Sequence, residues 1–507
     1  MRRLAVGRWE NLLLGGWIFA FAVTRAGRLQ DTDPYWQVVA GREVLAGSPL
    51  ARPDGWSWAP VGGLFYPNSP AWNVLLARAW DLAGSWGMFV LSAATIAAYL
   101  SLVALLARRL GAGPLATIGS ILVTNLTVLP MVSPRATMAA QLLVMAAIAF
   151  AVSWAHGAAN HRPSANALVV GTVGLAVSAS GNWVHLSWST LSIAVAMAWM
   201  VIWSLWPCLS QSSRLAMGTA GTFGLLAGVL AGPYGLSVYQ RASAVLDACQ
   251  GLILEWSGAF TPGPATRWAL PALLAIGVTL WSAAWCVTSA RLNHGADPRL
   301  AIAASLTLLA LPAAVAGVIA IRFIGVALLT IAPMTTLAIS LVMRRLHTRF
   351  SEVPKSGRSR AAEYTSAPTW RILLTLLIVV LAPFMAWYAS PHSEPATAEA
   401  TQLLPADCRL FALSNESAAV ILLRPDVPVW LDGRAEYWGR SRLEEMNRRI
   451  YAVDPAQPVP PAATCVLLPP ADVNPEIAAL TKALDESPDW ARTATTPTAV
   501  VWVRHPN

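Results

Sequence analysis

The chain has 507 residues, of which 56% are hydrophobic and only 12% are charged. Because soluble domains carry roughly a quarter charged residues, this deficit indicates a protein whose main solvent is lipid. The formal charge of +9 is typical of basic residues held against an anionic membrane surface. No basic run stands in a polar domain where nucleic acid would bind. The five cysteines are too few and too scattered for a disulfide scaffold or a metal cluster.

Apolar runs long enough to cross a bilayer recur along residues 1–389 and predict an all-α multi-pass domain. The first run follows three arginines and has no convincing cleavage site after it, so it is interpreted as a retained signal anchor. We count eleven runs, near 11–24, 85–107, 113–132, 136–155, 166–182, 186–206, 216–232, 268–290, 300–320, 323–343 and 371–389.

The distribution of Lys and Arg predicts a cytoplasmic N-terminus, because basic residues concentrate in alternate connections. The last inner connection is the richest, with Arg344, Arg345, Arg349, Lys355, Arg358, Arg360 and Arg371. An odd number of spans then places residues 390–507 on the outer face, together with long loops at 25–84 and 233–267. Within the first loop, apolar residues at helical spacing predict two short interfacial helices, over 36–45 and 70–82.

The C-terminal segment, residues 390–507, has a different pattern. Its apolar runs shorten to strand length at Cys408–Leu413, Val427–Leu431, Thr464–Leu468 and Ala499–Val503, and Asn474–Leu484 has helical period. Pro-rich turns separate these runs, so a small extracytoplasmic α/β domain is expected. Cys408 and Cys465 begin two of the predicted strands and could form a disulfide. Cys249 would then be a lone thiol on the outer side.

Two carboxylates, Asp31 and Asp33, stand where the first span ends and the first outer loop begins. A carboxylate at such a rim can act as a general base towards a hydroxyl, or hold a divalent cation such as Mg²⁺ or Mn²⁺. Pro34 disfavours helical geometry at Asp33, which helps both side chains to reach one centre. The alternative is that either Asp caps the interfacial helix that follows.

Three arginines, Arg135, Arg241 and Arg322, lie near span boundaries on the predicted outer side. A charged Arg near hydrocarbon costs about 2.5–3.5 kcal/mol on insertion scales unless it pairs or reaches the headgroup zone. Together they could clamp a phosphate, whose oxygens a guanidinium matches bidentately; each could also simply reach lipid phosphate. His185, in a tight outer turn, could donate to a phosphate or orient a carboxylate, or be an ordinary turn residue.

Asp432-Gly433-Arg434 ends a predicted strand of the C-terminal domain, and Glu436 and Tyr437 follow it. This motif could belong to a functional site, although Asp-Gly is also an ordinary turn signal. The chain contains no P-loop, no dinucleotide-binding fingerprint, no Ser-His-Asp arrangement and no Cys/His spacing typical of a metal site.

These motifs, taken in order, resemble a family of bacterial multi-pass proteins with the GT-C glycosyltransferase fold. The resemblance begins with D-x-D-x-x-W over residues 31–36, a G-R-x-x-L helix and Asp54-Gly55-Trp56-Ser57-Trp58. It continues with Ser133-Pro134-Arg135, Asn182 with His185, Gly232-Pro233-Tyr234-Gly235, Glu255-Trp256, Arg322-Phe323, and Asp432-Gly433-Arg434 with Tyr437. Two segments depart from the family. Asn68-Ser69-Pro70-Ala71-Trp72 replaces a frequent His-Glu-Trp, and Ser133-Pro134-Arg135 replaces the usual Arg-Pro-Gln.

The resemblance implies an enzyme of the bacterial plasma (inner) membrane that acts in the cell envelope. It would transfer a sugar from a polyprenyl-phosphate donor to a glycan, lipid or protein acceptor on the outer face; most members of the family have no assigned substrate. Asp31 or Asp33 would be the base or hold a divalent cation, and Arg135, His185, Arg241 and Arg322 would bind the donor phosphate. The alternative is a non-catalytic scaffold or lipid-glycan handling protein, which the missing His-Glu pair favours.

Overall fold

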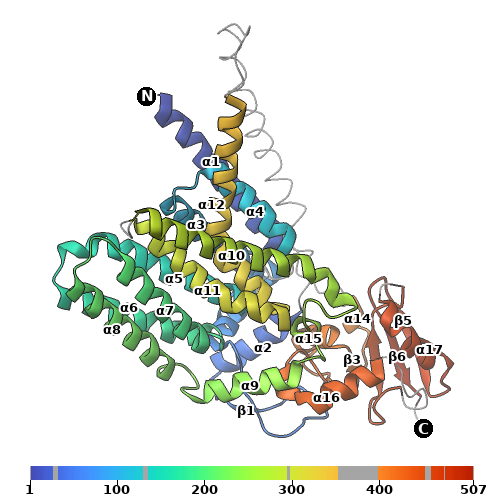
Figure 1. The fold of residues 1–507 in the computed structure, drawn as a ribbon. Coiled ribbons are helices and arrows are strands. Elements are labelled where there is room, and N and C mark those ends of the chain that lie inside the picture. The colour runs from blue at the N-terminus through green and yellow to red at the C-terminus, as the bar shows by residue number, and fades with distance from the viewer. Residues whose placement is uncertain are drawn as a thin grey trace, which may run out of the picture.

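The computed structural model describes residues 2–26, 32–128, 135–293, 297–351, 398–450, 458–472 and 474–505. Long helices form the body of the molecule, and a small sheet with short helices lies at one end of it (Figure 1). We refer to residues 398–505 as the tail and to the end of the body that carries it as the tail side.

The body consists mainly of helices, and its first loop contains a small antiparallel pair of strands, β1 (Arg52–Pro53) and β2 (Leu64–Phe65). Its helices are α1 (Arg2–Ala26), α2 (Asp33–Leu45), α3 (Pro70–Arg109), α4 (Pro114–Val128), α5 (Ala136–Gly157), α6 (Pro163–Val184), α7 (Trp188–Leu205), α8 (Gln211–Leu230), α9 (Ser237–Cys249), α10 (Ala269–Asn293), α11 (Pro298–Ile319) and α12 (Arg322–Ser351). Several begin with Pro in their first turn, where the missing N–H costs nothing and the fixed φ suits the helix.

Seven helices of the described chain, α3, α5, α6, α7, α10, α11 and α12, are long and apolar enough to cross a membrane. The runs expected near 11–24 and 216–232 lie in α1 and α8, and the run near 113–132 begins in the shorter apolar helix α4. The run near 371–389 lies outside the described residues. The prediction of an all-α multi-pass body with a small C-terminal α/β unit is confirmed.

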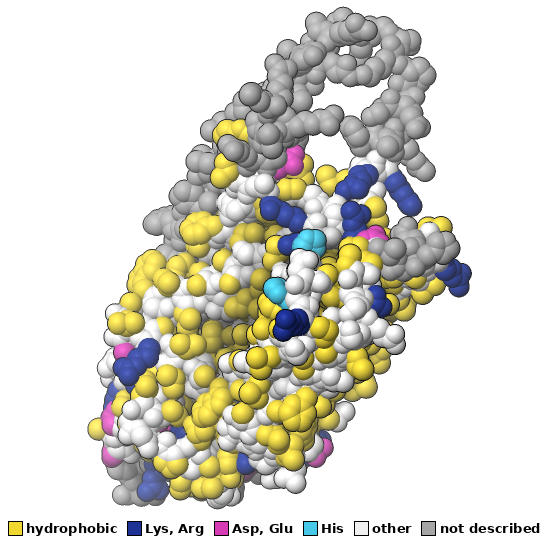
Figure 2. Space-filling model, turned by 90° about the vertical axis from the view of Figure 1, so that its left-hand side faces the viewer, with side chains coloured by type: hydrophobic (Ala, Val, Ile, Leu, Met, Phe, Trp, Pro, Cys, Tyr) yellow, Lys and Arg dark blue, Asp and Glu magenta, His cyan; other side chains and the backbone are white. Residues whose placement is uncertain are grey.

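Large apolar side chains stand on the surface of the body, as a lipid solvent requires. Leu168 on α6 and Phe223 on α8 are both more than two-thirds exposed, at 72% and 76%. Hydrophobic side chains cover much of the face in Figure 2. A soluble monomer rarely shows apolar patches of this extent.

The first loop contains the two short helices that the sequence predicts. α2 is the first of them. The second is the first part of α3, from Pro70 to about Leu82. At Ala83 and Gly84 the backbone leaves helical geometry, and Gly84 has a φ of 56°. This left-handed conformation favours glycine, and it separates residues 70–82 from the membrane-spanning part of α3.

The tail contains a four-stranded sheet with the order β3-β4-β6-β5, in which β3 and β4 are parallel and the other neighbours antiparallel. Its elements are α14 (Ala398–Thr401), β3 (Leu410–Ala412), α15 (Ser414–Leu423), α16 (Ala435–Ile450), β4 (Cys465–Leu468), α17 (Ala478–Glu486), β5 (Trp490–Thr495) and β6 (Val500–Arg504). Cys408 and Cys465 form a disulfide with their Cα atoms 5.6 Å apart, as the sequence suggested, and Cys249 is a buried free thiol.

The first loop joins the edge of the tail sheet. The backbone of Trp58 donates to the carbonyl of Val429 at 3.1 Å, and the backbone of Val429 donates to the carbonyl of Trp56 at 2.9 Å. Val429 also makes a bridge with Leu410 of β3. Because these backbone groups satisfy one another, loop and tail form one continuous unit, although more than 300 residues separate them in the sequence.

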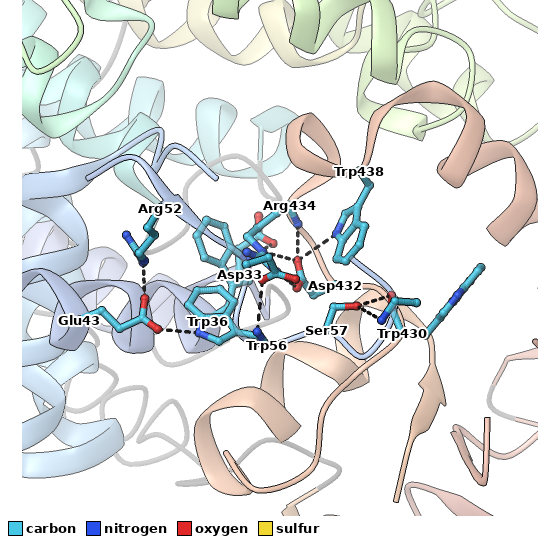
Figure 3. A network of polar contacts seen from close by, with 12 residues as sticks. Asp33, Trp36, Glu43, Arg52, Trp56, Ser57, Trp430, Asp432, Arg434 and Trp438 are labelled. Atoms are coloured by element: carbon cyan, nitrogen blue, oxygen red, sulfur yellow. Dashed lines mark hydrogen bonds and ion pairs between the residues drawn. The ribbon is translucent and has the colours of Figure 1, made fainter. Parts of the chain in front are cut away.

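A buried arginine holds this unit together (Figure 3). The Arg434 guanidinium lies 2.6 Å from Asp432 and 2.7 Å from Asp54, with all three side chains at most 1% exposed. It stacks over Trp56 at 4.2 Å and Phe65 at 4.6 Å. Burial alone would lower the pKa of Arg434, but the two carboxylates raise it above its ordinary value. The charge therefore persists, and it links the loop residue Asp54 to the tail.

Replacing Arg434 by Ala should destabilise the protein by about 3–5 kcal/mol, because two buried carboxylates would lose their counter-charge. Thermal or denaturant unfolding of the full chain in detergent micelles measures this loss. Lys482→Ala is the control in the tail: Lys482 pairs with Glu486 on α17 while both are about two-thirds exposed or more, and such surface pairs contribute about 0–1 kcal/mol. Equal losses in the two variants would contradict the role of Arg434.

Candidate functional site

Asp33 is the first residue of α2, and its carboxylate faces charged and polar groups. Thr32 holds the N-cap position, and no side chain caps the helix there. The Trp36 indole donates to Asp33 Oδ1 at 3.1 Å, while Asp33 Oδ2 lies 3.7 Å from Arg135 Nη2. Asp31 lies outside the described residues, so its part in the site stays a prediction.

Arg135, at the N-cap of α5, bridges two carboxylates. Besides Asp33 it contacts Glu255, whose Oε1 lies 2.7 Å from Arg135 Nη1. Glu255 belongs to a single 3₁₀ turn, Leu254–Trp256, in the connection between α9 and α10. The contact thus brings together three segments that are far apart in the sequence. From the sequence, Glu255 was recognised only as part of the Glu255-Trp256 motif and was not predicted to belong to the site.

Arg322, at the start of α12, lies beside this group with its guanidinium available. Its Cζ stands 4.2 Å from the centroid of the Trp256 ring. Within the described chain no residue makes a hydrogen bond or ion pair with this guanidinium. Stacking on an aromatic face orients a guanidinium without using its N–H donors. Arg322 is therefore fixed in position and free to bind an anion.

His185 lies in the turn between α6 and α7, near both arginines. Burial, reinforced by the positive charges of Arg322 and Arg135, lowers its pKa to about 3. Its Nδ1 accepts the Ser187 backbone N–H at 3.1 Å, which assigns the proton of the neutral ring to Nε2. His185 therefore offers a neutral N–H donor beside Arg322 and Arg135.

The Arg241 guanidinium packs against two tyrosine rings, those of Tyr66 and Tyr234, which form an aromatic cradle around it. It lies 3.3 Å from the centroid of the Tyr66 ring and 5.0 Å from that of Tyr234. Its Nε is buried without a hydrogen-bond partner among the described residues. Tyr234, in turn, donates to the Pro67 carbonyl at 2.5 Å. The structure gives Arg241 no ion pair within the described chain, in contrast with Arg135.

The tail motif divides into three roles. Asp432 and Arg434 are buried in the contact with the first loop, as described above. Tyr437 packs on Phe65, with ring centroids 6.2 Å apart. Gly433 lies directly on the site: a Cβ at this position would be 2.5 Å from Asp33 Oδ1 and 3.2 Å from Trp36 Nε1. The sequence suggested a turn glycine, whereas the structural requirement is the close approach of the tail backbone to Asp33.

The expected divalent cation has one described ligand, Asp33. In the described ranges no group of three or more His, Cys, Asp or Glu side chains is placed to hold a metal ion. Both Asp33 oxygens already face donors, the Trp36 N–H and the Arg135 guanidinium. A cation here would need Asp31 as a second ligand, and the metal site stays a prediction.

Comparison with known proteins gives only distant similarities. No family model and no curated protein matches the chain. It is similar to the archaeal oligosaccharyltransferase AglB from Archaeoglobus fulgidus, solved with an inhibitory peptide and a dolichol-phosphate, at 12% identity over 97% of this chain and 74% of that one, with a TM-score of 0.49. It is also similar to ArnT from Cupriavidus metallidurans, bound to undecaprenyl phosphate, at 13% identity over 98% and 99%, with a TM-score of 0.48. Function has to come from the chain's own residues.

Replacing Gly433 by Ala should cost about 1–3 kcal/mol, since the new methyl group would overlap Asp33 and force either the tail or Asp33 to move. Gly55→Ala is the control, because nothing lies within 4 Å of a Cβ at Gly55. Unfolding of the full chain in micelles measures both. A Gly433→Ala variant as stable as Gly55→Ala would show that the close contact is absent in solution.

His185 should make the stability of the protein depend on pH below its ordinary pKa of about 6.5. As the pH falls from 6.5 towards 3, the unfolded chain takes up a proton at His185 that the folded chain does not, so stability decreases by up to about 1.4 kcal/mol per pH unit. Unfolding midpoints at pH 7.5 and 5 should differ less in His185→Gln than in the original chain. Identical differences would contradict a neutral, buried His185.

Proposed function

We propose that this protein is a membrane glycosyltransferase that moves a sugar from a polyprenyl-phosphate donor to an acceptor at its tail side. The observation that carries the proposal is the free guanidinium of Arg322, held on Trp256 beside the neutral His185. An unpaired, oriented guanidinium next to a neutral N–H donor suits a phosphate. The order of short motifs along the chain, which resembles the GT-C family, supports the same reading.

Arg322 and His185 would bind the phosphate that leaves during transfer. A guanidinium can hold two phosphate oxygens at once, and the His185 Nε2–H can donate to another. Donors preorganised where negative charge develops stabilise the transition state, because they need little rearrangement. Arg135 adds positive charge nearby but is already paired with Asp33 and Glu255. Arg241, cradled by two tyrosines, would contact the same donor lipid farther along.

Asp33 would act as the general base. The acceptor hydroxyl would attack the anomeric carbon of the sugar as its proton passes to an Asp33 oxygen. The bond between that carbon and the phosphate oxygen would break at the same time, leaving polyprenyl phosphate with both electrons of the bond. One displacement of this kind inverts the anomeric configuration. A divalent cation, if Asp31 and Asp33 hold one, would stabilise the same phosphate.

The position of the site suits a lipid donor. Arg135 is the N-cap of α5 and Arg322 is the first residue of α12, and both helices are able to cross a membrane. A prenyl chain in the bilayer could therefore place its phosphate there. The bias of Lys and Arg along the chain supports an outer location. The resemblance to the GT-C family implies a bacterial plasma membrane and a role in cell-envelope synthesis. The acceptor would be a glycan, lipid or protein.

A second candidate is a non-catalytic protein of envelope assembly. The observation in its favour is Asn68–Trp72, where the related family often has His-Glu-Trp. Asn68 contributes its backbone there: its carbonyl accepts the Leu186 N–H at 2.8 Å, next to His185. Such a protein could bind a lipid-linked sugar at the same arginines without transferring it.

Asp33→Asn and Arg322→Gln should each reduce transfer by about 10²–10³-fold, the usual effect of removing one group that acts on the transition state. The assay reconstitutes the full chain in liposomes with a panel of radiolabelled undecaprenyl-phosphate hexoses and bacterial envelope extracts as acceptors. Arg344→Gln is the control, since Arg344 is exposed and donates to Gly111 beside α4. Full transfer by both site variants would end the enzyme proposal; donor binding without transfer by the original chain would favour the second candidate.

A further inference from the structure

The tail brings a carboxylate of its own, Glu436, to the site. Glu436 is the second residue of α16 and follows Gly433 by three positions. The backbone at Gly433 lies against Asp33, so the start of α16 is fixed beside the proposed base. The sequence showed Glu436 only as a neighbour of the Asp-Gly-Arg motif.

The backbone of α16 breaks at Gly439, where φ is 71°, and the segments on both sides of the break contact the second long loop. Arg440 donates to the backbone carbonyls of Asp247 and Gln250, both at 3.2 Å. This loop also carries Tyr234, Glu255 and Trp256. In the first turn of α16, Ala435 and Trp438 share a hydrophobic cluster with Ala248 and Cys249 of this loop, and Trp256 packs against it. The first turn therefore lies between Asp33 and the loop that carries Trp256, on which Arg322 stacks.

The charges around Glu436 agree with this placement. Burial raises the pKa of its carboxyl. A hydrogen bond from its own backbone and the charges of Arg434 and Arg322 oppose that rise, and Asp432 adds to it. Glu436 also contributes to the raised pKa of Tyr234, which burial causes in the main. The carboxyl of Glu436 therefore lies within electrostatic range of Arg322 and of Tyr234.

One of the two carboxylate oxygens of Glu436 has no hydrogen-bond partner among the described residues. This oxygen is Oε1, and it is buried. The neighbouring Arg434 is already used by Asp432 and Asp54. A buried carboxylate oxygen without a donor costs free energy and is rare in native proteins. The side chain as a whole is half-buried, so it is not sealed from a ligand in the site.

We propose that Glu436 binds a hydroxyl group of the sugar on the lipid donor, which makes the tail a determinant of sugar specificity. This inference rests on the proposed function. A carboxylate repels the phosphate itself and accepts hydrogen bonds from hydroxyls. The sugar is joined to the donor phosphate through one oxygen, so it is the hydroxyl-bearing group nearest to Arg322.

The experiment compares two probes, undecaprenyl phosphate and an undecaprenyl-phosphate hexose, bound to the full chain in lipid nanodiscs. Glu436→Gln keeps the shape and removes the charge. It should weaken binding of the hexose probe about fivefold to tenfold and leave undecaprenyl phosphate unchanged or bound more tightly. Glu444→Gln is the control, because Glu444 lies on α16 in an exposed pair with Arg440, and it should change neither.

Each other outcome is decisive. Equal effects of Glu436→Gln on both probes, or weaker binding of an acceptor with the hexose probe unaffected, would overturn the inference and leave the proposed function standing. Failure of the original chain to bind either probe would remove the proposed function itself. If Glu436→Gln does not fold, Glu436→Asp takes its place, because it keeps the charge and shortens the side chain. It should weaken binding of the hexose probe alone. Unchanged binding of the hexose probe by Glu436→Asp would also overturn the inference.

Discussion

The structure depends on one buried cation shared between distant parts of the chain. Arg434 neutralises Asp432 from the tail and Asp54 from the first loop, and the aromatic rings around it exclude water. Removing charges from water is costly, so such a group persists only when every partner is present. This requirement fixes the tail against the loop, and the rigid turn that results carries Gly433 to Asp33 and Glu436 to the site.

The site itself forms at the ends of helices. Asp33, Arg135 and Arg322 stand at the starts of α2, α5 and α12, and His185 and Glu255 lie in connections. Charged groups are tolerable there because they can pair or reach the headgroup zone, whereas mid-span they would face hydrocarbon. The pairing is uneven: Arg135 has two carboxylates and Arg322 has none within the described chain. That imbalance leaves one oriented cation for a ligand, and the burial that lowers the pKa of His185 leaves a neutral donor beside it.

Several features could be predicted because their signals are local. Two examples are the break before the long part of α3 and the strands near 408–413 and 464–468, which follow from short-range patterns. The Cys408–Cys465 disulfide was only one possibility for the sequence, because pairing across 57 residues depends on the fold. Gly433 could not be placed in this way, since Asp-Gly is a turn signal whatever it touches. The same holds for Glu255 and Glu436, whose partners are set by contacts between segments more than 100 residues apart.

Composition and periodicity by themselves determined a multi-pass helical body with a polar α/β tail, because burial in lipid and in a small core imposes distinct hydrophobic patterns. The sequence also selected candidate site residues, each with a structural alternative: Asp31, Asp33, Arg135, His185, Arg241 and Arg322. Only the tertiary structure decided which of these meet, which are paired and which stay free. The reason is that electrostatic interactions depend on the distance between groups and on their burial, and neither quantity can be read from the sequence.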